Sequence, residues 1–131
     1  MKNFFRLALA ISFLAVSAGV GTAQTASTKT VMRQKLVHSQ RVFEAIMSSN
    51  FAQLERESAA LTKATESPAW SVFNSPEYLR EAGAFLQATR DLATAAKGHD
   101  LDAAARHYIE LTRSCFQCHR YIKDARIARG H

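Results

Sequence analysis

The stretch DLDAAARHYIELTRSCFQCHRYIKDARIAR, residues 100–129, contains neither proline nor glycine. Asp100 is a favourable helix N-cap, and apolar residues then recur at helical spacing along the stretch. We therefore predict a single long helix from Asp100 to about Arg129. Its inward stripe consists of Leu101, Ala104, Tyr108, Leu111, Cys115 and Ile122.

Three further helices are predicted upstream, at about residues 27–49, 50–66 and 75–97. Asn50 and Ser75 are suitable N-caps, and Pro76 is favoured as a first helical residue. A lysine followed by Gly98 ends the third helix, because a cation in the last turn and a glycine after it are typical of helix C-termini.

Each of these helices has an apolar stripe that we expect to face a common core. The stripe of the first helix is Met32, Leu36, Ser39, Phe43, Ile46 and Met47, and that of the second is Phe51, Leu54, Ser58, Leu61 and Thr65. In the third it is Leu79, Ala82, Leu86, Thr89 and Ala93, with Tyr78, Phe85 and Leu92 beside it. Trp70, Val72 and Phe73 form an apolar connector that should pack over one end of the core. Four amphipathic helices with short links predict an all-α, up-down-up-down four-helix bundle.

Residues 1–23 have the three parts of a Sec-type signal peptide. A short basic segment precedes an apolar run at residues 7–16, and small residues follow it. A membrane anchor is the alternative, but the apolar run has about ten residues, where a spanning helix needs roughly 20. We expect export to the periplasm, with cleavage after Ala23 or, alternatively, after Ala18.

Cleavage after Ala23 leaves one predicted domain, residues 24–131, whose formal charge falls from +6 to +4 because Lys2 and Arg6 are removed. The remaining cations are dispersed among carboxylates, with no basic block interleaved with aromatic residues, so we expect no nucleic-acid partner. We also expect no membrane span in this domain. Basic residues gather late in the chain, either as a solvated helix face or as a docking rim for an acidic partner protein. They are Arg106, Arg113, Arg120, Lys123, Arg126 and Arg129.

The only two cysteines of the chain stand three positions apart in the predicted last helix, and a histidine follows the second. At roughly 100° per residue, Cys118 and His119 lie within about 60° of Cys115, on the inward face. The pattern Cys-x-x-Cys-His is typical of c-type haem attachment, in which the thiols bind the two haem vinyl groups and the histidine binds the iron. Export suits this chemistry, because c-type attachment takes place outside the cytoplasm in bacteria.

Three other interpretations of the motif fit less well. A thioredoxin-like dithiol normally sits at a helix N-terminus after a strand, whereas Cys115 lies deep inside a predicted helix. Structural zinc needs four ligands, often from a second cysteine pair, and His107 is about three turns away along the helix. A structural disulfide between Cys115 and Cys118 would be strained on one helix.

A Cys-x-x-Cys-His motif near the C-terminus of an all-helical chain of this length resembles the class II c-type cytochromes, which include cytochrome c′ and cytochrome c-556. The resemblance covers the layout of residues 24–131, and the haem motif is its specific part. It implies one covalent haem c near the end of the last helix, held by thioethers from Cys115 and Cys118 and by His119 as the proximal iron ligand. It also implies that the distal face of the haem lies against the first half of the first helix.

The residue on the distal face decides whether the iron has a sixth ligand. The pair Arg-Gln at 33–34 resembles a pair that the family often has in its first helix, with the distal leucine or methionine four residues after the arginine. Here that position is Val37, and neither Val37 nor the neighbouring Leu36 can bind iron. Met32, one turn earlier on the inward stripe, is the distal candidate, with core packing as its other interpretation. An open site and ligation by His38 are the alternatives.

The sequence as a whole predicts a periplasmic mono-haem cytochrome that carries single electrons, and not an enzyme, because no acid–base or nucleophilic group accompanies the haem motif. A five-coordinate haem that binds nitric oxide or carbon monoxide is the alternative. The haem subunit of a larger redox complex is a third option. The expected partner is a redox protein, docked at the basic face of the last helix, and a homodimer is compatible with the sequence.

Overall fold

The computed structural model describes residues 27–130, so the predicted signal peptide at residues 1–23 lies outside the described residues. The described chain forms four α-helices, one 3-10 turn and no strand. They are α1 (Thr28–Met47), α2 (Phe51–Ala64), η1 (Pro68–Trp70), α3 (Pro76–Lys97) and α4 (Leu101–Ala128). The all-α prediction is therefore confirmed, and each helix ends within two residues of its expected position.

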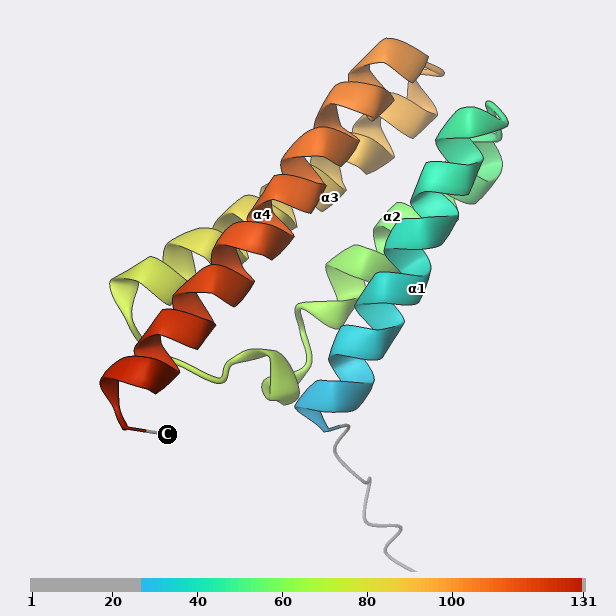
Figure 1. Cartoon of the computed structure of the whole chain (residues 1–131). Coiled ribbons are helices and arrows are strands. Elements are labelled where there is room, and N and C mark those ends of the chain that lie inside the picture. The colour runs from blue at the N-terminus through green and yellow to red at the C-terminus, as the bar shows by residue number, and fades with distance from the viewer. Residues whose placement is uncertain (1–26, 131) are drawn as a thin grey trace, which may run out of the picture.

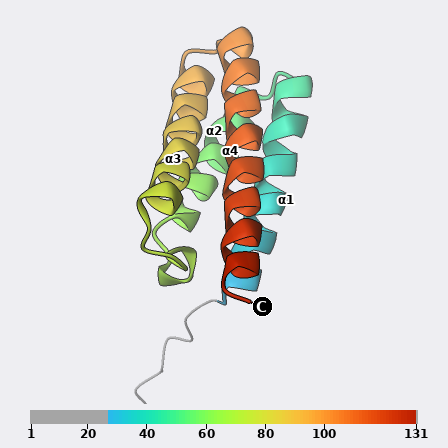
Figure 2. The same cartoon turned by 60° about the vertical axis from the view of Figure 1, so that its left-hand side comes forward.

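The four helices pack side by side, consistent with a helical bundle (Figures 1 and 2). Helix α1 packs along α2, α2 along α3 and α3 along α4, whereas α1 and α4 touch at only a few points. The turns that join α1 to α2 and α3 to α4 lie at one end, and η1 and the C-terminus lie at the other (Figure 1). None of the helices in residues 27–130 has the length and apolar character needed to cross a membrane.

The predicted N-caps are present. The side chains of Asn50, Ser75 and Asp100 each accept a hydrogen bond from the backbone N–H three residues later, at 3.0, 3.2 and 2.8 Å. Each bond satisfies a backbone donor that the first helical turn leaves without a partner. The capping pattern in the sequence was therefore sufficient to place the starts of α2, α3 and α4.

Helix α3 ends at Lys97 with Gly98 as its C-cap, as predicted, and Gly98 has an ordinary φ of −80°. The next residue, His99, takes the left-handed conformation with φ 51°, and Ser49 does the same after α1 with φ 52°. The ring of His99 stacks on Phe51 with ring centroids 4.7 Å apart, a contact that glycine cannot make.

Replacing Ser49 by glycine should stabilise the protein by roughly 0.5–1 kcal/mol, because glycine adopts positive φ without the clash of a Cβ atom. Thermal unfolding followed by circular dichroism measures the change. Ser48→Gly is the matched control in the same turn: Ser48 has φ −96°, and its hydroxyl donates to the Glu44 carbonyl at 2.8 Å. That variant should be less stable than wild type. A gain in both variants, or a loss in both, would contradict the prediction.

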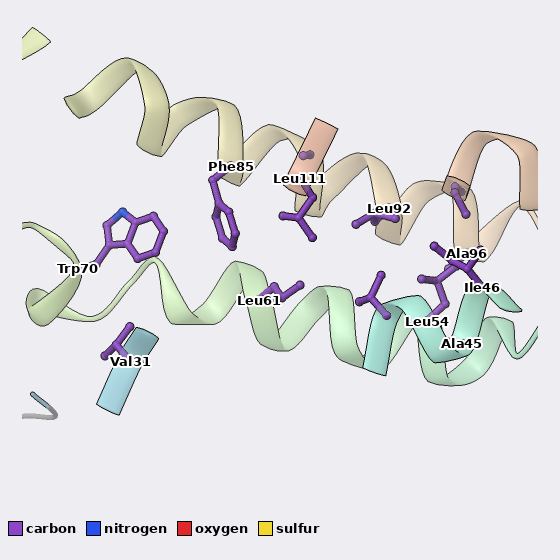
Figure 3. Packing of buried hydrophobic residues seen from close by; sticks show 14 residues of the cluster. Val31, Ala45, Ile46, Leu54, Leu61, Trp70, Phe85, Leu92, Ala96 and Leu111 are labelled. Carbon is purple, nitrogen blue, oxygen red and sulfur yellow. The ribbon is translucent and has the colours of Figure 1, made fainter. Parts of the chain in front are cut away.

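The buried core runs the length of the helices. Figure 3 shows Trp70 and Phe85 close together near one end, and Ile46, Ala45 and Ala96 near the other. The Trp70 and Phe85 rings are 5.1 Å apart between centroids, and Trp70 is 6% exposed, so the predicted role of the connector tryptophan in the core is confirmed.

The buried face of α1 agrees with the predicted stripe at Ile46 and differs from it at most other positions. Leu36, Phe43 and Met47 are 60%, 51% and 71% exposed, respectively. The line that is buried consists of Val31, Lys35, Val42, Ala45 and Ile46. It is rotated by about one residue, or roughly 100°, from the expected stripe. A lysine within the line hid it from a search for apolar periodicity.

A smaller rotation affects α3. Leu79 is 55% exposed, whereas the neighbouring line of Tyr78, Phe85 and Leu92 is at most 2% exposed. The large side chains of that line fill the centre, and of the predicted line only Thr89 is fully buried.

Candidate functional site

A groove of about 780 Å³ lies between α1 and α4. Its walls include Met32, Lys35, Leu36 and Val37 from α1, and Leu111, Cys115, Phe116 and His119 from α4. Two residues of the predicted α1 stripe, Met32 and Leu36, therefore face this groove instead of a closed core. The volume falls within the range of roughly 300–1,000 Å³ that is typical of cofactor and ligand sites.

Of the two cysteines, Cys115 is the one that lies on the groove wall. It is half-buried and forms no disulfide. Burial raises the pKa of its thiol, while the nearby Lys35 ammonium acts in the opposite direction. The thiol is therefore mainly protonated at neutral pH in the haem-free chain.

Cys118 is also half-buried and free, but it is not part of the groove wall. Burial raises the pKa of its thiol too, and its charged neighbours include Glu81 of α3 as well as Lys35. Cys115 therefore lies on the groove wall and Cys118 beside it, and Lys35 is close to both thiols.

His119 lies on the groove wall and is exposed. None of the hydrogen bonds and ion pairs found within residues 27–130 involves its imidazole, so both ring nitrogens are accessible to a ligand. The motif therefore brings one thiol and the imidazole to the same groove, with the second thiol one helical turn from the first.

Lys35 is the residue that the sequence analysis missed. It is the only charged residue in the buried line of α1, with 8% exposure. Its Nζ lies 3.8 Å from the ring centroid of Trp70 and 3.8 Å from that of Phe85. Burial lowers the pKa of Lys35 from 10.5 to about 8, while interaction with Cys115 and Cys118 acts in the opposite direction. The available signal was that Lys35 follows Val31 by four residues, which puts both on one face of the helix. A lysine in an otherwise apolar line, however, normally indicates the end of the buried face.

The distal candidates are separated by the structure. Met32 is half-buried on the groove wall, together with Leu36 and Val37. His38 points elsewhere: its Nδ1 lies 2.6 Å from a carboxylate oxygen of Glu57 on α2, and it is not part of the groove wall. The His38 side chain is half-buried at this contact with α2.

The cations of α4 are all exposed, as both interpretations of them require. Arg106, Arg113 and Arg120 follow one another at seven-residue intervals, so they lie on one face of the helix. None of the ion pairs found in the described part of the chain includes them. This face is free to interact with a partner.

The residues present fit a covalently attached haem. One unoxidised thiol and an accessible imidazole border a groove whose walls are mainly apolar, and the second unoxidised thiol lies one helical turn from the first. Among residues 27–130, no three His, Cys, Asp or Glu side chains come together to hold a metal ion by themselves. No family model, curated protein or solved structure matches this chain.

Proposed function

We propose that this chain is an exported, periplasmic mono-haem c-type cytochrome that carries single electrons and is not an enzyme. The observation that carries the proposal is the Cys-x-x-Cys-His motif on α4, with Cys115 and His119 on the wall of a large groove. The order of the helices and the position of their turns (Figure 1) support an up-down-up-down bundle. The haem would lie in the groove between α1 and α4. The resemblance to class II c-type cytochromes rests on the same features.

In this proposal Cys115 and Cys118 form the two thioether bonds, and His119 is the proximal ligand. When bound, the haem iron supplies a one-electron couple between its ferric and ferrous states. The apolar side chains on the walls of the groove, including Leu36, Leu111 and Phe116, would pack against the macrocycle and limit the access of water to it. Low solvent access reduces the reorganisation of water that accompanies a change of charge at the site.

The exposed arginines of α4 supply a docking surface for an acidic redox protein. Charge complementarity of this kind increases the rate of encounter more than the affinity, and salt weakens it. Arg113 and Arg120 are two helical turns apart on one face, at either side of the motif. Electron transfer to an acidic partner should therefore slow as ionic strength rises.

Acid–acetone extraction of the exported, mature protein tests the attachment. Covalent haem stays on the polypeptide in this treatment, and the mass of the intact protein exceeds that of the chain by one haem. Non-covalent haem would move to the solvent phase and leave the bare polypeptide mass. That second result, or a protein without any haem, would overturn the proposal.

Met32→Ala decides the coordination of the iron. If Met32 is the distal ligand, the wild-type protein is low-spin, and the variant becomes high-spin and binds carbon monoxide. Thioether ligation raises the haem potential and favours electron transfer, so the potential of the variant should fall as well. Optical spectra of both oxidation states, with and without carbon monoxide, measure the change, and Met47→Ala on the exposed end of α1 is the control.

A gas-binding protein is the second candidate, and one observation favours it. Leu36 and Val37, which cannot bind iron, share the groove wall with His119. If the wild-type protein is already high-spin and takes up carbon monoxide, Met32 is a packing residue and the sixth position is open. Binding of nitric oxide or carbon monoxide then becomes the preferred function.

A further inference from the structure

Lys35 is a cation in the interior of the described part of the chain, where no carboxylate pairs with it. Its side chain is 8% exposed, and none of the ion pairs formed by residues 27–130 includes it. The rings of Trp70 and Phe85, each with its centroid 3.8 Å from Nζ, are its principal partners. Aromatic faces attract a cation through their quadrupole, and the attraction is stronger where water is excluded.

The same ammonium group borders the place where the haem would be attached. Lys35 is part of the groove wall, and its charge is close enough to Cys115 and Cys118 to influence both thiols. Lysines are rare in protein interiors unless their charge is paired, because moving a charged group out of water is unfavourable. Its position beside both attachment residues therefore needs a functional reason.

Resting on the proposed function, we propose that Lys35 sets the reduction potential of the haem, by holding a positive charge in the groove wall where the electron arrives. A fixed positive charge at low dielectric stabilises the ferrous state, which carries one positive charge less than the ferric state. The electron comes from the redox partner protein, and no bond to Lys35 forms or breaks. Trp70 and Phe85 act as positioning residues that keep Nζ inside the groove wall.

Three substitutions separate charge from packing. Lys35→Met removes the charge from an unbranched side chain of similar length, and it also removes a buried ion, so the variant should fold. Lys35→Arg keeps the charge. Lys29→Met is the matched control, because Lys29 is on the same helix and the same groove wall but is exposed.

The measurement is a spectroelectrochemical titration of each purified holoprotein at one pH and ionic strength. At a fixed ambient potential we expect the ferrous-to-ferric ratio of Lys35→Met to fall at least about tenfold, equivalent to 59 mV for one electron. Lys35→Arg should stay within about threefold of wild type, and so should Lys29→Met, because water screens an exposed charge.

Each other outcome counts against the inference in a distinct way. An unchanged ratio in Lys35→Met, with haem covalently attached, overturns the role of Lys35 and leaves the proposed function intact. Equal shifts in Lys35→Met and Lys35→Arg would mean altered packing. Conversion of Lys35→Met alone from low-spin to high-spin would make Lys35 an iron ligand. Absence of covalent haem from the wild type overturns both this inference and the function on which it rests.

Discussion

We expect Cys115→Ala and Cys118→Ala each to remove most of the haem that the proposed function attaches to the chain. Each thiol supplies one of two thioether bonds, so a single substitution leaves the macrocycle with one attachment and less constraint. We expect the yield of holoprotein to fall by roughly tenfold or more. The loss of a group that supports a metal site typically lowers metal affinity or activity by at least this factor. The double variant should carry no covalent haem at all.

The measurement is the haem absorbance per unit of protein after acid–acetone extraction, for variants expressed with the full N-terminal segment. Gln117→Ala is the matched control, since Gln117 lies between the two cysteines and is not part of the groove wall. It should attach haem as the wild type does. Full haem content in the double variant would show that the motif is not the attachment site.

The two cysteines also allow a graded comparison. Cys115 faces the groove and Cys118 is turned toward α3, with Glu81 among its charged neighbours. The thiol on the groove wall is the better placed of the two for a group bound there. Cys115→Ala should therefore have the larger effect on haem content.

The haem-free chain should remain helical but lose stability and sharp packing. The packing of the helices shows why: α1 packs along α2, α2 along α3 and α3 along α4, but α1 meets α4 at few points. Between them lies a groove of about 780 Å³, and Leu36 and Phe116 on its walls are 60% and 73% exposed. Without a group to cover them, these apolar surfaces stay in contact with water.

The magnitude follows from linkage between binding and folding. A ligand present at 100 times its dissociation constant stabilises the folded state by about 2.7 kcal/mol, and covalent attachment has at least this effect. For a domain of about 100 residues, that corresponds to a fall in Tm of roughly 10–20 °C on removal of the haem. The haem-free chain should also melt over a wider range of temperature.

Circular dichroism in the far and near ultraviolet, compared between holoprotein and the Cys115→Ala/Cys118→Ala chain, tests this. The far-ultraviolet signal should persist, and the near-ultraviolet signal and the dispersion of side-chain NMR resonances should diminish. Gln117→Ala, with haem attached, should melt close to wild type. A haem-free chain with a sharp, cooperative transition at the wild-type temperature would contradict the expectation.

Much of the fold was predictable because local signals agree with one another. The N-caps at Asn50, Ser75 and Asp100 are properties of a few neighbouring residues. They act through hydrogen bonds that span three residues, so they need no knowledge of the rest of the chain. Helix α2 shows the same agreement, since the predicted line of Leu54, Ser58 and Leu61 is the one that is buried.

The errors arose where a helix has two apolar faces. Leu36 and Phe43 made a convincing stripe on α1, yet the neighbouring line through Val31, Lys35 and Val42 is the one that packs on the core. Apolar periodicity measures which residues avoid water, and it does not distinguish a core from a groove that another group would fill. Lys35 was missed because apolar periodicity does not predict a buried lysine. Its ammonium is tolerated in the interior because the rings of Trp70 and Phe85, which come from other elements, lie against it.

The sequence by itself determined the helices and their N-caps, and it predicts haem attachment at Cys115, Cys118 and His119, because each of these depends on residues close together in the chain. Only the tertiary structure decided which face of α1 is buried, that Cys115 and His119 share a groove with Met32, and that His38 pairs with Glu57. These depend on how α1 is rotated and placed against α2 and α4. That rotation is set by the fit of whole helix surfaces, where one residue of register turns a side chain by roughly 100°.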